Sequence, residues 1–167
     1  VEGRLREITR AGAVVDPPGV VRIEAEDETV VSRHGEWRLL NIFPRSVDAE
    51  VLRTGEPDAR LTFTFSGRSL ALVLPGTWQI PGPKYSGLRT GGLEIRVGDR
   101  PPTIVDLATA PQNVVIATDL PAGEHDVSVA PSQLKGRGWG SVAIDGFKVG
   151  AFPFSTLSFL VVGEESA

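Results

Sequence analysis

Residues 60–73 have the sequence RLTFTFSGRSLALV, and this stretch sets the expectation for the whole fold. Leu61, Phe63 and Phe65 alternate with threonines, which is the pattern of a strand with one buried and one solvated face. A Ser-Gly turn follows, and the apolar run at 69–74 predicts a second strand directly after it. We therefore expect two antiparallel strands whose phenylalanines belong to the inner layer of a sheet.

The same pattern of short strands and turns extends through most of the chain. Turn residues such as Gly, Pro, Asn and Asp recur between the runs, and no amphipathic helix interrupts them. Further strands are predicted at 20–27, 29–33, 36–42, 49–53, 93–97, 103–107, 113–118, 125–130, 141–149 and 156–162. This spacing predicts an all-β antiparallel β-sandwich or jelly roll, not a parallel α/β sheet.

The domain organisation is simple. We expect residues 1–19 to form an N-terminal arm or linker that ends in a stiff Asp-Pro-Pro-Gly turn. We expect residues 20–167 to form a single β-sandwich domain. The apolar segment 150–162 is too short to span a bilayer and predicts a final strand or a passage into a further domain.

The composition excludes several chemistries. The 167 residues include no cysteine and two histidines, so there is no disulfide framework, thiol nucleophile or thiolate metal site. Seventeen basic residues against 21 acidic ones argue against a nucleic-acid partner. No apolar run of 18 residues occurs, so no direct membrane insertion is expected.

Several motifs together resemble the galactose-binding-like jelly-roll domains. These motifs are the 60–73 stretch, LEIRVGD at 93–99, LPAGEHDVSV at 120–129 and SVAIDGFKV at 141–149. Domains of this kind occur as carbohydrate-binding modules and as accessory domains of secreted esterases and glycosidases. The resemblance covers roughly residues 20–149 and implies an extracellular or cell-surface location.

A second resemblance concerns Ile23–Asp27, IEAED, which is similar to the first strand of calcium-containing jelly-roll modules. It implies a structural calcium ion held by Glu24, Glu26 and Asp145, and carboxylates at alternate positions share one face of a strand. The chain lacks the aromatic and glycine run that normally follows this strand. The alternative is that Glu24 and Glu26 form the solvated face of an edge strand.

Two loops carry residue types that suit sugar recognition, in which aromatic rings stack and polar groups bond hydroxyls. Loop 75–92 is long for a connection between strands. The candidate ligand-binding residues are Trp78, Gln79, Lys84, Tyr85 and Arg89 from loop 75–92, and Arg137 and Trp139 from loop 131–141. Alternatively, Trp78 closes one end of the sandwich and Trp139 packs into the core. The sequence does not decide whether both loops lie at the same end.

The other aromatic and histidine residues predict structural roles. Trp37 alternates with charged residues and is expected to pack in the core. His125 follows a glycine turn and opens a strand, so local hydrogen bonding is expected, whereas His34 is expected to be exposed in a turn.

No catalytic motif is present. The sequence has no G-x-S-x-G nucleophile elbow, and Gly98-Asp99-Arg100 is not the Gly-Asp-Ser block of secreted esterases. We therefore predict a non-catalytic carbohydrate-binding module of a larger extracytoplasmic protein, with carbohydrate and neighbouring domains as partners. The alternative is a structural domain that docks against a catalytic or membrane domain and takes no small ligand.

Overall fold

The computed structural model describes residues 19–41, 50–75, 89–136 and 138–151. Over these ranges the chain forms strands and turns without a helix. The strands are β1 (Val20–Glu24), β2 (Ser32–His34), β3 (Arg38–Asn41), β4 (Glu50–Thr54), β5 (Arg60–Ser66), β6 (Ser69–Val73), β7 (Gly92–Val97), β8 (Thr103–Asp106), β9 (Asn113–Ala117), β10 (Glu124–Ser132), β11 (Val142–Ile144) and β12 (Gly146–Gly150). Among the described residues, no helix has the length and apolarity needed to cross a membrane.

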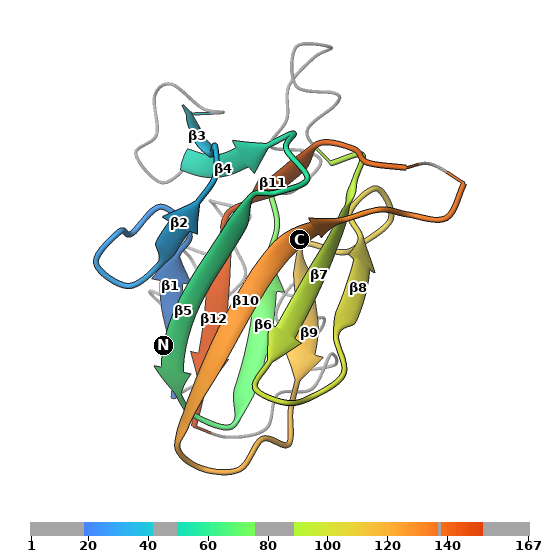
Figure 1. The fold of residues 1–167 in the computed structure, drawn as a ribbon. Coiled ribbons are helices and arrows are strands. Elements are labelled where there is room, and N and C mark those ends of the chain that lie inside the picture. Colours follow the sequence, from blue (N-terminus) through green and yellow to red (C-terminus); the bar gives the residue numbers. More distant parts are fainter. Residues whose placement is uncertain (1–18, 42–49, 76–88, 137, 152–167) are drawn as a thin grey trace, which may run out of the picture.

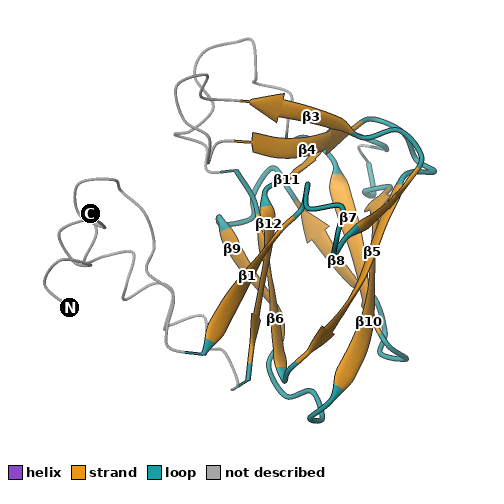
Figure 2. Cartoon of the chain, turned by 90° about the vertical axis from the view of Figure 1, so that its left-hand side faces the viewer, coloured by secondary structure: helices purple, strands orange, loops and turns teal. Residues whose placement is uncertain are grey.

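The strands form two facing sheets and a smaller third one (Figures 1 and 2). The back sheet has the order β1-β12-β6-β9 and the front sheet the order β2-β5-β10-β7-β8. The third sheet, β11-β4-β3, lies across one end of the sandwich. Every pairing is antiparallel, which confirms the predicted all-β antiparallel sandwich.

The core lies between the two large sheets. On β5, Leu61, Phe63 and Phe65 are at most 5% exposed, as their alternation predicts. The ring of Phe63 lies 4.5 Å from that of Phe147 on the back sheet, centroid to centroid. Aromatic pairs at this distance add to the stabilisation that burial of apolar surface provides.

One predicted strand is shorter in the structure, and another is broken into two. The strand predicted at 20–27 ends at Glu24, because Asp27 turns the chain and its carboxylate accepts hydrogen bonds from the amide and hydroxyl of Thr29. These bonds lower the pKa of Asp27. The strand predicted at 141–149 breaks at Asp145, where the chain passes from the third sheet to the back sheet.

Some predictions fall outside the described residues. They are the strand at 156–162 and nearly all of the N-terminal arm at 1–19.

Candidate functional site

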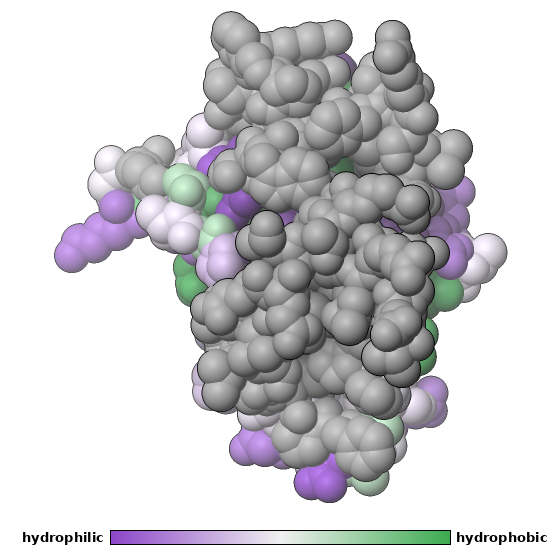
Figure 3. Space-filling view, turned by 180° about the vertical axis from the view of Figure 1, so that it is seen from behind, coloured by the Kyte–Doolittle hydropathy of each residue, from purple (hydrophilic) through white to green (hydrophobic). Residues whose placement is uncertain are grey.

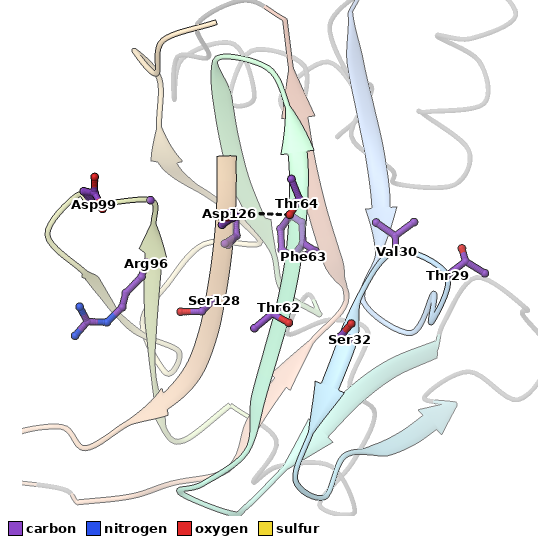
Figure 4. Close-up of a pocket in the computed structure, with 12 residues that line it drawn as sticks. Thr29, Val30, Ser32, Thr62, Phe63, Thr64, Arg96, Asp99, Asp126 and Ser128 are labelled. Carbon is purple, nitrogen blue, oxygen red and sulfur yellow. Dashed lines mark hydrogen bonds between the residues drawn. The ribbon is translucent and has the colours of Figure 1, made fainter. Parts of the chain in front are cut away.

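The front sheet carries a hollow on its outer face, with a volume of about 750 Å³. Its walls come from four strands, from the segment before β2 and from the β7–β8 turn (Figure 4). Most of the side chains that line it are polar: Thr29, Ser32, Thr62, Thr64, Arg96, Asp99, Asp126 and Ser128.

The register of the strands builds a row of polar side chains across this hollow. Ser32 of β2 pairs with Thr62 of β5, Thr62 pairs with Ser128 of β10, and Ser128 pairs with Arg96 of β7. Directly paired residues of antiparallel strands project from the same face. The row therefore presents three hydroxyls and a guanidinium side by side over four neighbouring strands.

A second pair of polar groups lies beside the row. The Thr64 hydroxyl donates to Asp126 Oδ1 at 2.7 Å, which holds this carboxylate over the sheet (Figure 4). Arg96 pairs with Glu94, two residues earlier on the same strand face. Because Asp99 and Asp126 add two negative charges to the lining, the hollow offers donors and acceptors to an uncharged ligand better than to an anion.

One histidine reaches the edge of the row. His34 Nε2 lies 3.4 Å from Thr62 Oγ1. An activated nucleophile needs a base that a third group orients, and the structure gives His34 no such partner within its described part.

The sequence predicts the direction of two of the side chains that line the hollow. The alternation in β5 predicts that Thr62 and Thr64 face away from the core, which is confirmed because Phe63 and Phe65 are buried. Which strands lie next to β5 does not follow from that alternation, because β10 pairs with β5 from about 60 residues further along the chain. The polar row was therefore missed.

The two predicted ligand loops meet at their C-terminal ends. The amides of Thr90 and Gly91 donate to the carbonyl of Ser141 at 3.2 and 2.9 Å, and the amide of Ser141 donates to Thr90 Oγ1 at 2.9 Å. Trp139 precedes this junction and is 48% exposed, so it does not pack into the core, and its role in ligand binding stays a prediction. The described residues of the 131–141 loop project from one side of the molecule (Figures 1 and 3). Trp78, Gln79, Lys84, Tyr85 and Arg137 lie outside the described residues.

Arg89 takes a structural position instead of the ligand-facing one expected of it. Its side chain is buried, and its guanidinium donates to the carbonyls of Leu107 at 2.9 Å, of Pro75 at 2.8 Å and of Ala110. Burial lowers the pKa of Arg89. The guanidinium therefore joins the start of loop 75–92 to the segment after β8.

The contact between the loops depends on glycine, which leads to a first prediction. A Cβ at Gly140 would lie 2.6 Å from the backbone N and Cα of Gly91, so the two segments would have to separate. Gly140→Ala should lower the free energy of unfolding by about 1–3 kcal/mol, as overpacking does. Urea denaturation measures this, and hydrogen exchange at the amides of Gly91 and Ser141 should accelerate.

Gly55→Ala is the matched control. Nothing lies within 4 Å of a Cβ at Gly55, so this change should be neutral or slightly stabilising. Equal unfolding curves for the two variants would contradict the close approach of the loops.

The three predicted metal ligands are not gathered into one cluster. Glu24 and Asp145 both pair with Arg22, which lies between them. Within the ranges that the structure describes, no group of three or more His, Asp or Glu side chains is placed to hold a metal ion. Burial raises the pKa of Asp145, and the charge and hydrogen bond of Arg22 oppose that shift.

The structural roles predicted for Trp37 and His125 and the predicted exposure of His34 are confirmed. Trp37 is half-buried against the core and donates from Nε1 to the His34 carbonyl at 3.2 Å. His125 donates from Nε2 to the Pro121 carbonyl at 2.7 Å, and its ring lies 5.5 Å from that of Phe65. His34 is exposed.

The chain is thus an all-β sandwich domain with a polar hollow on one sheet. No protein-family model and no curated protein matches the chain. Solved structures do match it. A family two carbohydrate esterase from Cellvibrio japonicus is 20% identical with a TM-score of 0.57, over 81% of this chain and 35% of that one.

Two further structures show the same likeness. A two-domain esterase active on acetylated mannans is 12% identical with a TM-score of 0.57, over 81% of this chain and 37% of that one. An exo-beta-1,3-galactanase from Phanerochaete chrysosporium is 15% identical with a TM-score of 0.52, over 80% of this chain and 30% of that one. The chain thus shares its fold with parts of carbohydrate-active enzymes and spans about a third of their length. Membership of the galactose-binding-like family stays a prediction.

Proposed function

We propose that this chain is a non-catalytic carbohydrate-binding domain of a larger extracellular protein, and that the hollow on the front sheet is its binding site. The observation that carries the proposal is the row of Ser32, Thr62, Ser128 and Arg96 over four strands. A sugar presents hydroxyls that both donate and accept hydrogen bonds, and this row offers partners of both kinds.

The dimensions of the row support a chain-like ligand. Four neighbouring strands give three inter-strand spacings, which place Ser32 about 14 Å from Arg96. A site of that length would accommodate several sugar rings laid across the strands. Asp126 and Thr64 lie beside the row and would bond the outer edge of such a ligand.

The charge of the hollow narrows the class of glycan. The lining carries two aspartates against one arginine, and that arginine already pairs with Glu94. We therefore expect neutral glycans to bind better than glycans with carboxylate or sulfate groups.

Two further considerations support the proposal. The three solved structures described above are carbohydrate-active enzymes, and this chain spans about a third of each. A chain of this relative length is expected for a module that binds a glycan and lies next to a separate catalytic domain. The exposed Trp139 supplies a stacking surface at the loop end and is the second candidate site.

A glycan array followed by calorimetry tests the site. For the best neutral ligand, Thr62→Val combined with Ser128→Ala should lower the affinity about 30-fold, since two hydrogen bonds of about 1 kcal/mol each are lost. Both changes leave the backbone and the buried face of the strands as they are.

Thr109→Val is the matched control, because Thr109 is exposed and does not line the hollow. It should bind as the unmodified chain does. Loss of affinity in Trp139→Ala with full affinity in the hollow variant would move the site to the loops. Absence of binding to any glycan would contradict the function and favour a docking domain.

A further inference from the structure

Four charged side chains meet where β1 lies against β12 on the back sheet. They are Arg22 and Glu24 of β1, Lys148 of β12, and Asp145 at the β11–β12 junction, and we call them the Arg22 cluster. Arg22 pairs directly with Lys148 in the register, so both project from the same face of the sheet.

Arg22 is the centre of this cluster. Its Nε lies 2.6 Å from Glu24 Oε1, and its Nη2 lies 3.0 Å from Asp145 Oδ2. Nη2 also donates to Glu24 Oε2 at 3.5 Å. One guanidinium therefore pairs with two carboxylates, one on β1 and one at the β11–β12 junction. The other Asp145 oxygen, Oδ1, is buried without a hydrogen-bond partner.

The cluster lies where the backbone joins three strands. The amide of Asp145 donates to the Val73 carbonyl at 3.0 Å, and its carbonyl accepts from the Ala25 amide at 3.2 Å. Asp145 is 7% exposed and Lys148 is 3% exposed, so their charges are largely removed from water. Buried charges of this kind need partners, or they destabilise the fold.

The charges of the cluster already balance. Two carboxylates face a guanidinium and an ammonium, and Lys148 is close enough to Asp145 to act on its charge. Calcium takes six to eight oxygen ligands and brings two positive charges. Placed on Glu24 and Asp145, it would meet Arg22 in the same position and leave an excess of positive charge.

We infer that Arg22 takes the place of the calcium ion that the sequence resemblance implies, so that Glu24 and Asp145 bind an internal guanidinium and the domain folds without calcium. The pairing of β1 with β12 is then equally stable at any calcium concentration. The same two carboxylates become a cation site only when Arg22 is removed.

Thermal denaturation with calcium and with a chelator tests this inference. A ligand that binds the native state raises its melting temperature by mass action. The unmodified chain should melt within about 1 °C in millimolar CaCl2 and in EGTA. Isothermal titration of the unmodified chain with CaCl2 should give no binding heat. A calcium-dependent rise in melting temperature, or a measurable binding heat, would overturn the inference.

Arg22→Gln supplies the second part of the test. This variant leaves Glu24 and Asp145 without their shared partner, so it should melt lower in EGTA, and CaCl2 should recover several degrees. MgCl2 at the same concentration should recover less, because Mg²⁺ accepts fewer protein ligands and keeps its waters. An Arg22→Gln variant that folds but ignores calcium would also overturn the inference.

Two controls separate charge from packing. Arg22→Lys keeps the positive charge and should stay indifferent to calcium. Arg22→Gln combined with Asp145→Asn removes one carboxylate, and its response to calcium should disappear. If Arg22→Gln does not fold, the melting curves and titration of the unmodified chain still decide the matter.

Discussion

Arg89→Met should lower the free energy of unfolding by about 3 kcal/mol. The guanidinium donates to three backbone carbonyls, and methionine leaves all three without that donor. Hydrogen bonds from a charged group contribute about 1.5–3 kcal/mol each, but they are not additive, and the variant no longer buries a charge. Urea denaturation followed by circular dichroism measures the change.

Two variants make this prediction specific. Arg89→Lys should recover less than half of the loss, because one ammonium cannot reach three carbonyls that a planar guanidinium spans. Arg100→Met is the matched control, since the Arg100 side chain is 42% exposed and pairs with Asp119, and it should cost no more than about 0.5 kcal/mol. Similar urea midpoints for Arg89→Met and Arg100→Met would show that Arg89 does not tie the loop in place.

Phe147→Ala should have the largest effect on stability, a loss of about 3–5 kcal/mol. Phe147 is 1% exposed and its ring lies 4.5 Å from that of Phe63, so alanine leaves a cavity between the two sheets. Phe147→Leu fills part of that cavity and should cost about 1–1.5 kcal/mol. The measurement is again the urea midpoint, with the slope compared to establish that unfolding remains cooperative.

Ile104→Ala serves as the control for apolar truncation. Ile104 lies on β8 and is 50% exposed, so its removal should change stability by no more than about 0.5 kcal/mol. If Phe147→Ala and Ile104→Ala have the same urea midpoint, Phe147 does not contribute to the packing of the two sheets.

The position of the phenylalanines in the core could be predicted from the residue pattern alone. The alternation in residues 60–66 predicts a strand with its phenylalanines inside, and Phe63 and Phe65 are indeed buried. A period of two depends only on backbone geometry, so it can be recognised without knowledge of neighbouring strands. The all-β antiparallel fold follows from many such segments between turns.

The role of Arg89 shows where that reasoning stops. Its place in a long loop of aromatic and polar residues favoured ligand binding, but the structure surrounds it with the carbonyls of Pro75, Leu107 and Ala110. A carbonyl that needs a donor leaves no trace in the side-chain sequence. Arg22 is similar, because its two carboxylate partners come together only when β1 pairs with β12.

The sequence by itself determined the strand pattern, the buried phenylalanines, the absence of cysteine chemistry and the outward direction of Thr62 and Thr64. Only the tertiary structure decided that β2, β10 and β7 flank β5, which aligns Ser32, Ser128 and Arg96 with Thr62 in one row. The physical reason is the range of the interactions. Alternation is a local property of one strand, whereas the hollow and the Arg22 cluster depend on pairings between residues far apart in the chain.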